Sequence, residues 1–203
     1  CDMSFFENTR KPVGFGGKLM VAMMNVGHSA VARWGLQFLN AAPDAKALDC
    51  GCGGGANIKR LLKKCPQGIV KGIDYSPVSV EKSKKVNEAA IAEGRCAVLQ
   101  GSVANMMFAD NWFDAVTAFE TVYFWPDLSL CFREVYRVLK PDGTFLICNE
   151  SNGDSGKDEK WTKIIGGMTI YKDAELKAYL EQADFHEVQI HKKKDWLCVT
   201  ARK

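Results

Sequence analysis

The strongest structural signal in the chain is the stretch Ala47-Leu48-Asp49-Cys50-Gly51-Cys52-Gly53-Gly54-Gly55. Two apolar residues end in an acid, and four glycines follow within five positions. Apolar residues then recur with the spacing of one helix face, at Ile58, Leu61, Leu62 and Cys65. The stretch therefore predicts a strand, a tight turn and a helix. Glycine there can take positive φ and lets a ligand lie against bare backbone N–H groups at the helix N-terminus, so we expect a nucleotide-type cofactor.

Strands and helices alternate along the rest of the chain. Apolar runs predict further strands at 68–74, 96–99, 112–119 and 144–148, and helical periodicity predicts helices at 19–40, 76–93 and 128–139. Beyond residue 150 we expect a short helix at 161–168, a helix capped by Asp173, and a hairpin of strands at 185–191 and 196–201. Such alternation indicates a parallel α/β sheet.

Neither a repeat nor a linker divides the sequence, so we expect a single domain over residues 1–203. Its parts would be an N-terminal arm or lid (1–45), a cofactor-binding core (46–150), and a C-terminal part with a lid segment, the last helix and the hairpin (151–203).

The composition excludes several classes of protein. A net charge of +3 is too small for a nucleic-acid interface, and we expect the one basic run, Lys192-Lys193-Lys194, to be a solvated hairpin tip. The eight cysteines form no C-x-x-C pair and are not spaced with His28, His186 or His191 as metal ligands. We therefore expect buried thiols, no metal and a reducing cytoplasmic location. No apolar run reaches the roughly 18–20 residues that span a membrane, and no signal peptide is evident.

Two cofactors remain open for the glycine turn. Gly51-x-Gly53-x-x-Ala56, with Asp74 further along, fits the dinucleotide fingerprint and would allow an NAD(P)-dependent oxidoreductase. Asp49 would repel a pyrophosphate, however, whereas it suits a ligand with an ammonium and a sulfonium. The late position of the turn, and a closing hairpin instead of a second mononucleotide-binding half, also favour a different cofactor.

Residues 49–55 resemble the D-x-G-x-G-x-G motif of class I S-adenosylmethionine-dependent methyltransferases. The resemblance continues through Gly72-Ile73-Asp74-Tyr75-Ser76, Phe113-Asp114-Ala115-Val116 and Leu139-Lys140-Pro141-Asp142-Gly143, and covers about residues 46–150. It implies a Rossmann-like, doubly wound sheet of seven strands in the order 3-2-1-4-5-7-6, with strand 7 antiparallel and helices on both faces. The implied cofactor is S-adenosyl-L-methionine, with S-adenosyl-L-homocysteine as product.

The resemblance also assigns roles to cofactor-binding residues. Asp74 would accept both ribose hydroxyls, since a carboxylate offers two adjacent acceptors, and Tyr75 would pack on the adenine. Ser102-Val103 lies where the family often has an acid for the adenine amino group, so the chain departs from the pattern there. The methionine portion would be approached by Asp49, Gly51, Cys52, Gly53, Phe119 and Glu120.

The acceptor site is less defined. No N/D-P-P-Y motif of amino-methylating DNA enzymes occurs after the fourth strand, which favours a small-molecule acceptor and in-line methyl transfer. A general base, if the acceptor needs one, would be His28 or Tyr123. The substrate pocket and its lids would include Phe15, Met24, Trp125, Trp161 and Tyr171. A module that binds the cofactor without catalysis is the remaining alternative, and the sequence predicts no oligomeric state.

Overall fold

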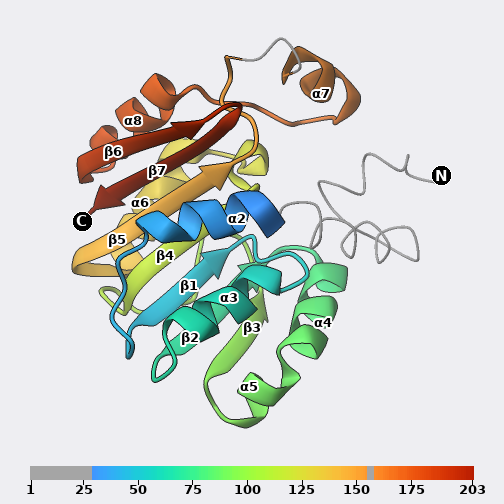
Figure 1. Cartoon of the computed structure of the whole chain (residues 1–203), viewed down its shortest axis with the longest axis vertical. Helices are drawn as coiled ribbons and strands as arrows, with labels where there is room; N and C mark the ends of the chain where they lie inside the picture. Colours follow the sequence, from blue (N-terminus) through green and yellow to red (C-terminus); the bar gives the residue numbers. More distant parts are fainter. Residues whose placement is uncertain (1–28, 155–157) are drawn as a thin grey trace.

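Seven strands of the described chain form one sheet in the order β3-β2-β1-β4-β5-β7-β6 (Figure 1). The computed structural model describes residues 29–154 and 158–203, without the side chains of residues 159–161. β1 to β5 pair in parallel, and β7 runs antiparallel to both β5 and β6. The predicted sheet order and the antiparallel seventh strand are confirmed. The strands are β1 (Lys46–Cys50), β2 (Ile69–Asp74), β3 (Cys96–Gln100), β4 (Phe113–Phe119), β5 (Leu139–Asn149), β6 (His186–Lys193) and β7 (Trp196–Arg202).

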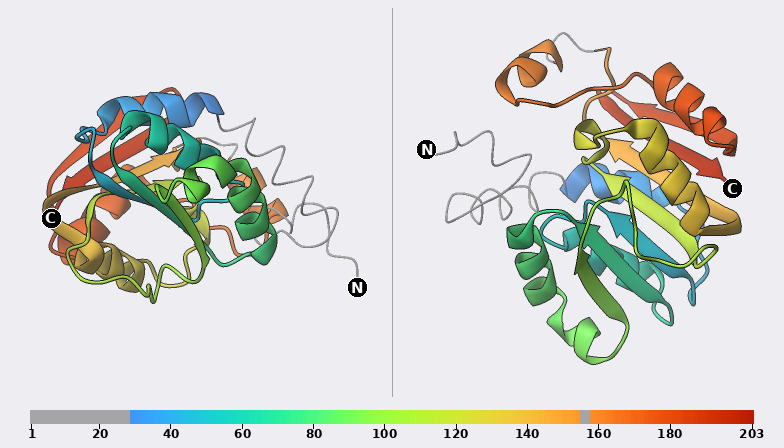
Figure 2. Two further views of the ribbon diagram at one scale, coloured as in Figure 1. Left: turned by 90° about the horizontal axis from the view of Figure 1, so that it is seen from below. Right: turned by 180° about the vertical axis from the view of Figure 1, so that it is seen from behind.

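Helices cover both faces of this sheet (Figure 2). α2, α3 and α4 pack on one face around Val31, Ile58 and Val80, while α6 and α8 pack on the other around Phe132 and Leu180. The helices are α2 (Ser29–Gly35), η2 (Leu36–Phe38), α3 (Ala56–Lys64), α4 (Pro77–Val86), α5 (Glu88–Ala92), η3 (Val122–Phe124), α6 (Leu128–Val138), α7 (Asp158–Ile164) and α8 (Asp173–Gln182).

Strand alternation divides the core into these two layers. In β4, Ala115 belongs to the α2 layer and Val116 to the α6 layer, as the period of two in a strand requires. The α6 layer is rich in aromatic rings, and Phe113, Phe132 and Phe145 are at most 1% exposed. Burial of each such side chain contributes about 1.5–3 kcal/mol. The division of the chain into arm, core and C-terminal part stays a prediction.

Local contacts change some of the predicted elements. The helix expected over 76–93 is interrupted at Asn87, where the side-chain amide donates to Gly55 O (3.0 Å) and Ser83 O (2.9 Å). The prediction that Asp173 caps α8 is wrong, because the N-cap is Lys172, whose N–H donates to the Glu175 carboxylate at 2.8 Å.

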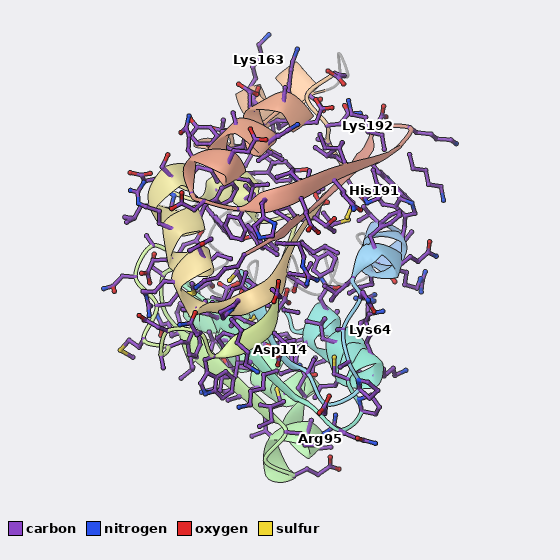
Figure 3. All side chains as sticks on the ribbon, turned by 90° about the vertical axis from the view of Figure 1, so that its left-hand side faces the viewer. Lys64, Arg95, Asp114, Lys163, His191 and Lys192 are labelled. Atoms are coloured by element: carbon purple, nitrogen blue, oxygen red, sulfur yellow. The ribbon has the colours of Figure 1, made fainter. Side chains whose placement is uncertain are left out.

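Two more predictions near the sheet need correction. β5 begins at Leu139 and not after the turn at 140–143, and Asp142 takes a φ of 62° within it. Lys192 is not simply solvated, since its ammonium pairs with Asp154 (3.1 Å) and Asp173 (2.8 Å). Lys192 and Lys163 lie at one end of the molecule and Arg95 at the other (Figure 3). Of the helix expected at 19–40, only α2 and η2 fall within the described residues.

The cysteines confirm the expectation of buried free thiols within the described residues. All seven cysteines there are free and buried. Cys148 of β5 lies opposite Cys198 of β7, and its thiol donates to Val31 O of α2 at 3.5 Å. A Cβ at Gly35 would lie only 2.4 Å from Cys148 Sγ, so α2 approaches the sheet as closely as glycine allows.

Gly35→Ala is therefore expected to destabilise the protein by about 1–3 kcal/mol, because overpacking at Cys148 outweighs the better helix propensity of alanine. Urea unfolding measures the change. Cys148→Ala removes the opposing sulfur, so the double variant should lose less stability than the sum of the two single variants. Strict additivity would contradict the contact.

Candidate functional site

The carboxyl ends of β1, β2 and β4 form the candidate site. Asp49 pairs in register with Gly72 of β2 and Thr117 of β4, and Asp74 is the last residue of β2. Open α/β sheets bind ligands outside the carboxyl ends of their strands. Asp49 and Asp74, the two acids predicted to determine which cofactor binds, therefore lie at one edge of the sheet.

The backbone N–H groups of the glycine turn are not bare, contrary to our expectation. Gly51 N and Cys52 N donate to Ile73 O at 2.8 and 3.1 Å, and Gly53 N donates to Asp74 Oδ2 at 2.9 Å. These three groups are directed back to β2, which satisfies them internally. A pyrophosphate needs such donors, so this turn is poorly suited to a dinucleotide.

Gly51 and Gly53 serve different purposes in this turn. Both have positive φ, 70° and 51° respectively. A Cβ at Gly51 would lie 2.0 Å from Thr121 Oγ1, whereas one at Gly53 would meet nothing within 4 Å. Gly51 is thus required for packing against the residues after β4. Gly53 borders open space, where a ligand can approach the backbone.

The Asp74 carboxylate connects the turn to the next helix. Oδ2 accepts the Gly53 N–H and Oδ1 accepts the Ser76 N–H, both at 2.9 Å. Ser76 is the N-cap of α4, as predicted, and its side chain accepts from Ser79 N. Burial raises the pKa of Asp74, and the two backbone hydrogen bonds act in the opposite direction. Each oxygen keeps a further lone pair for a ligand.

Asp49 is 1% exposed and only half satisfied. The Thr117 hydroxyl donates to Oδ1 at 2.8 Å, while Oδ2 has no hydrogen-bond partner within the part of the chain that the structure describes. Burial raises the pKa of Asp49 from 3.8 to about 7, opposed by the hydrogen bond from Thr117, and the nearby charge of Asp74 raises it further. A buried carboxylate oxygen without a partner is costly, and a cationic group would relieve that cost.

The pKa of Asp49 predicts a pH dependence of stability. Between about pH 4 and about pH 7 the folded state retains a proton that the unfolded state has released, so stability falls as pH rises through this window. Asp49→Asn removes the effect. In the cofactor-free protein, the free energy of unfolding of the variant relative to wild type should rise by on the order of 4 kcal/mol from about pH 4 to about pH 8. This follows from about 1.4 kcal/mol for each unit of the pKa shift.

Urea unfolding of both proteins across this pH range measures the difference. Parallel curves for the two proteins would show that Asp49 does not carry the raised pKa.

The residues after β4 are held by hydrogen bonds. Glu120 has a φ of 56°, and its Oε1 accepts the Glu150 N–H. The Tyr123 hydroxyl accepts the Ser151 N–H at 3.1 Å, and burial raises the pKa of Tyr123 well above its ordinary value. A phenol with so high a pKa stays protonated, which disfavours the predicted role of Tyr123 as a general base.

Other predicted cofactor contacts lie in different environments. Tyr75 is 39% exposed, and its carbonyl accepts from the Gln100 side chain. The Ser102 hydroxyl accepts Ala104 N within a turn, and Val103 is buried in the α6 layer. Phe119 is buried in the α2 layer, to which Cys52 of the glycine turn also belongs. These assignments stay predictions.

The predicted substrate residues are not all brought together. Trp125 is 8% exposed and stacks on Phe145 with centroids 6.3 Å apart, so its contacts are those of a core residue. Tyr171 is half-buried and packs edge-on against Tyr179. Outside the described residues lie Phe15, Met24, His28 and the side chain of Trp161.

Arg60 is a candidate site residue that the sequence patterns did not identify. Its guanidinium donates to Asn57 Oδ1 and Ser29 Oγ, both at 2.7 Å, and no ion pair of Arg60 occurs within 4.0 Å among the described residues. Asp49 and Arg60 nevertheless influence each other's pKa through their charges. The partly buried cation therefore lies near Asp49 without neutralising it. Only the fold, which brings α2 against α3, could have identified it.

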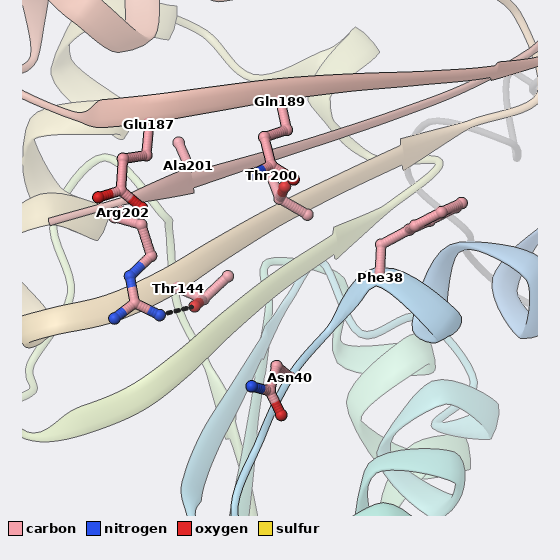
Figure 4. Close-up of a pocket in the computed structure, with 8 residues that line it drawn as sticks. All are labelled: Phe38, Asn40, Thr144, Glu187, Gln189, Thr200, Ala201 and Arg202. Atoms are coloured by element: carbon pink, nitrogen blue, oxygen red, sulfur yellow. Dashed lines mark hydrogen bonds between the residues drawn. The ribbon is translucent and has the colours of Figure 1, made fainter.

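A small pocket of about 170 Å³ lies at the opposite edge of the sheet (Figure 4). It is lined by Thr144 of β5 and Arg202 of β7, which pair in register with each other and lie level with the amino-terminal half of β4. It is therefore separate from the acids at the carboxyl edge. The described residues hold no group of side chains able to bind a metal, and no helix among them is long and apolar enough to cross a bilayer.

The sheet order, the glycine turn after β1 and the acid ending β2 define the fold of class I S-adenosylmethionine-dependent methyltransferases. The methyltransferase domain model matches residues 48–147. YrhH of Bacillus subtilis, whose name places it provisionally among the methyltransferases, is 30% identical over 158 residues, 78% of each chain. The chain belongs to this methyltransferase family.

Other relatives are longer or more distant. Cycloartenol-C-24-methyltransferase 1 of Oryza sativa subsp. japonica is 35% identical over 109 residues, 54% of this chain and 31% of the relative. The chain thus spans about a third of the length of such curated relatives. A methyltransferase structure from Aquifex aeolicus superimposes with a TM-score of 0.73 at 18% identity, covering 91% of this chain and 97% of that one, and so supports the fold.

Proposed function

We propose that this chain binds S-adenosyl-L-methionine at the carboxyl edge of β1, β2 and β4 and transfers its methyl group to a small-molecule acceptor. The buried, unpartnered Oδ2 of Asp49 is the observation that carries the proposal. It lies in the strand that leads into a glycine turn with open space at Gly53. An ammonium next to a sulfonium suits this environment, and a pyrophosphate does not.

Asp74 and Tyr75 would hold the nucleoside. The Asp74 oxygens each accept one backbone N–H and each keep a lone pair, so that the two hydroxyls of a ribose can donate one hydrogen bond apiece. The exposed ring of Tyr75 follows directly in the chain and supplies an apolar face for adenine.

Asp49 and Arg60 would hold the amino-acid end. An α-amino acid carries an ammonium and a carboxylate on one carbon. Asp49 and Arg60 are close enough for their charges to interact, yet they form no ion pair. A zwitterion between them would satisfy both, with the ammonium on Asp49 and the carboxylate on the guanidinium.

The chain's own part in catalysis is alignment and exclusion of water. The bound cofactor supplies an electrophilic methyl group on a sulfonium. Hydrogen bonds from Glu150 N to Glu120 and from Ser151 N to Tyr123 fix the backbone beside β4, where an acceptor has to be aligned with that methyl group. Tyr123 would act as a neutral hydroxyl, and His28 stays the predicted base for an acceptor that must lose a proton.

The acceptor class rests on the names of the relatives. Two of the relatives are named as a cycloartenol and a sterol C-24 methyltransferase, which supports a neutral, largely apolar acceptor for this chain. Free, buried cysteines among the described residues suit a cytoplasmic location, which is part of the proposal.

Titration calorimetry with two ligands tests the cofactor site. S-adenosylhomocysteine contains both nucleoside and amino acid, whereas methylthioadenosine lacks the amino acid. Asp74→Ala should weaken binding of both by about tenfold or more, and Arg60→Met should weaken S-adenosylhomocysteine alone by a similar factor, as expected for hydrogen bonds to charged groups.

Asp114→Ala is the matched control, because this carboxylate accepts the Lys46 N–H at the opposite edge of the sheet and should not alter either affinity. Binding of NAD(H) in place of S-adenosylhomocysteine would overturn the proposal. Equal losses for both ligands in Arg60→Met would remove Arg60 from the amino-acid subsite.

Catalysis is tested separately with methyl-labelled S-adenosylmethionine and a small-molecule extract. We expect label in an organic-soluble product that depends on the protein and is lost in Asp74→Ala. Cofactor binding without label transfer to any fraction would favour the non-catalytic alternative.

A further inference from the structure

Asn149 ends β5 at the same edge of the sheet as the proposed cofactor site. Its side chain is fully buried, and neither its amide nitrogen nor its amide oxygen has a hydrogen-bond partner among residues 29–154 and 158–203. Strand alternation places it on the face of Ile147, in the α6 layer, and it pairs in register with Leu197 of β7. An amide enclosed in this way loses its hydrogen bonds to water without replacement.

Other buried asparagines show how a structural side chain differs. Asn87 donates to Gly55 O and Ser83 O and joins α3 to α4. Asn152 donates to Lys194 O at 3.2 Å and accepts the Asp154 N–H at 2.9 Å. Asn149 has neither kind of bond. Within the described part of the chain, Asn149 is the one residue with two buried side-chain polar atoms that lack a hydrogen-bond partner.

The backbone next to Asn149 is fixed. Glu150 N donates to Glu120 Oε1, Ser151 N donates to the Tyr123 hydroxyl, and Thr169 N donates to Tyr123 O at 2.9 Å. The end of β5 is therefore tied to the end of β4 and to the segment after α7. A side chain on so well-ordered a backbone has a defined direction, so its missing partners are not explained by a loose strand end.

The order of the strands separates Asn149 from the cofactor contacts. The proposed nucleoside residue Asp74 is on β2 and the proposed ammonium residue Asp49 is on β1. β5 lies beyond β4 on the far side of β1, and the register places Leu146 of β5 level with Asp49. Asn149 is two strand spacings across the sheet and three residues further along it, and therefore roughly 14 Å from Asp49. A cofactor that extends from β2 to β1 points its methyl-bearing end toward β4 and β5.

We propose that Asn149 recognises a neutral hydroxyl-type group of the methyl acceptor, donating from Nδ2 and accepting at Oδ1. This inference rests on the proposed methyltransferase function. A hydroxyl both donates and accepts, and so satisfies both atoms of the amide with a single group. Asn149 thereby becomes a specificity-determining residue, because an acceptor without the hydroxyl leaves the amide unsatisfied.

Asn149→Leu separates this role from a structural one. Leucine has a similar size and removes two unsatisfied buried atoms, so the cofactor-free variant should melt no lower than wild type and should bind S-adenosylhomocysteine with unchanged affinity. Label transfer to the extract product should fall about tenfold to hundredfold, the effect of one buried polar interaction. In this proposal the hydroxyl that Asn149 recognises is separate from the atom that is methylated. The wild-type product should therefore keep that hydroxyl and still react with acetic anhydride.

Two controls complete the experiment. Asn87→Leu should lower the melting temperature, since its amide is hydrogen-bonded, and exposed Asn40→Leu at the far edge should leave label transfer unchanged. Should Asn149→Leu fail to fold, Asn149→Ala supplies the same measurements.

Undiminished label transfer in these variants, or a product without any hydroxyl, would overturn the inference, as would a crystal structure with product bound in which Asn149 contacts an internal water only. Failure of wild type to bind S-adenosylhomocysteine would instead reject the proposed function itself.

Discussion

The hydrogen bonds of the Asp74 carboxylate hold together the edge of the sheet where the site lies. One oxygen fixes the glycine turn through Gly53 and the other fixes the start of α4 through Ser76. The turn that follows β1 thus takes its shape from the residue that ends β2. A ligand bound to Asp74 contacts a group already positioned by both neighbours, so little ordering remains to be done on binding.

Asp49 differs from Asp74, because the fold leaves the hydrogen bonding of its carboxylate incomplete. Its burial opposes the charged form, and the hydrogen bond from Thr117 and the charge of Arg60 compensate for this only in part. The side chain of Asn149, two strands away, is also buried without hydrogen-bond partners among the described residues. Proteins tolerate such local instability where function requires it, and here the instability is concentrated at the carboxyl edge while the aromatic layer under α6 stabilises the whole.

The sequence predicted the sheet well because apolar periodicity and glycine placement are local signals. The turn after Asp49 and the start of α4 at Ser76 follow from such signals. Features that depend on distant partners were not predictable. The Gly51 and Cys52 amides are satisfied by Ile73, more than twenty positions away in sequence, and Arg60 is oriented by Ser29 of a helix that precedes the glycine turn. No pattern within one segment contains that information.

The two ion pairs of Lys192 bear on how a protein of this kind can diversify. Asp154 and Asp173 lie at either end of the segment that carries α7, and both contact one side chain of β6. The segment therefore leaves the sheet and returns to it at a single point. Lengthening such a segment costs little, because each doubling of loop length adds only about 0.6 kcal/mol to the free energy of loop closure. Its length and sequence can accordingly change while the strand register and the hydrogen bonds of Asp74 persist.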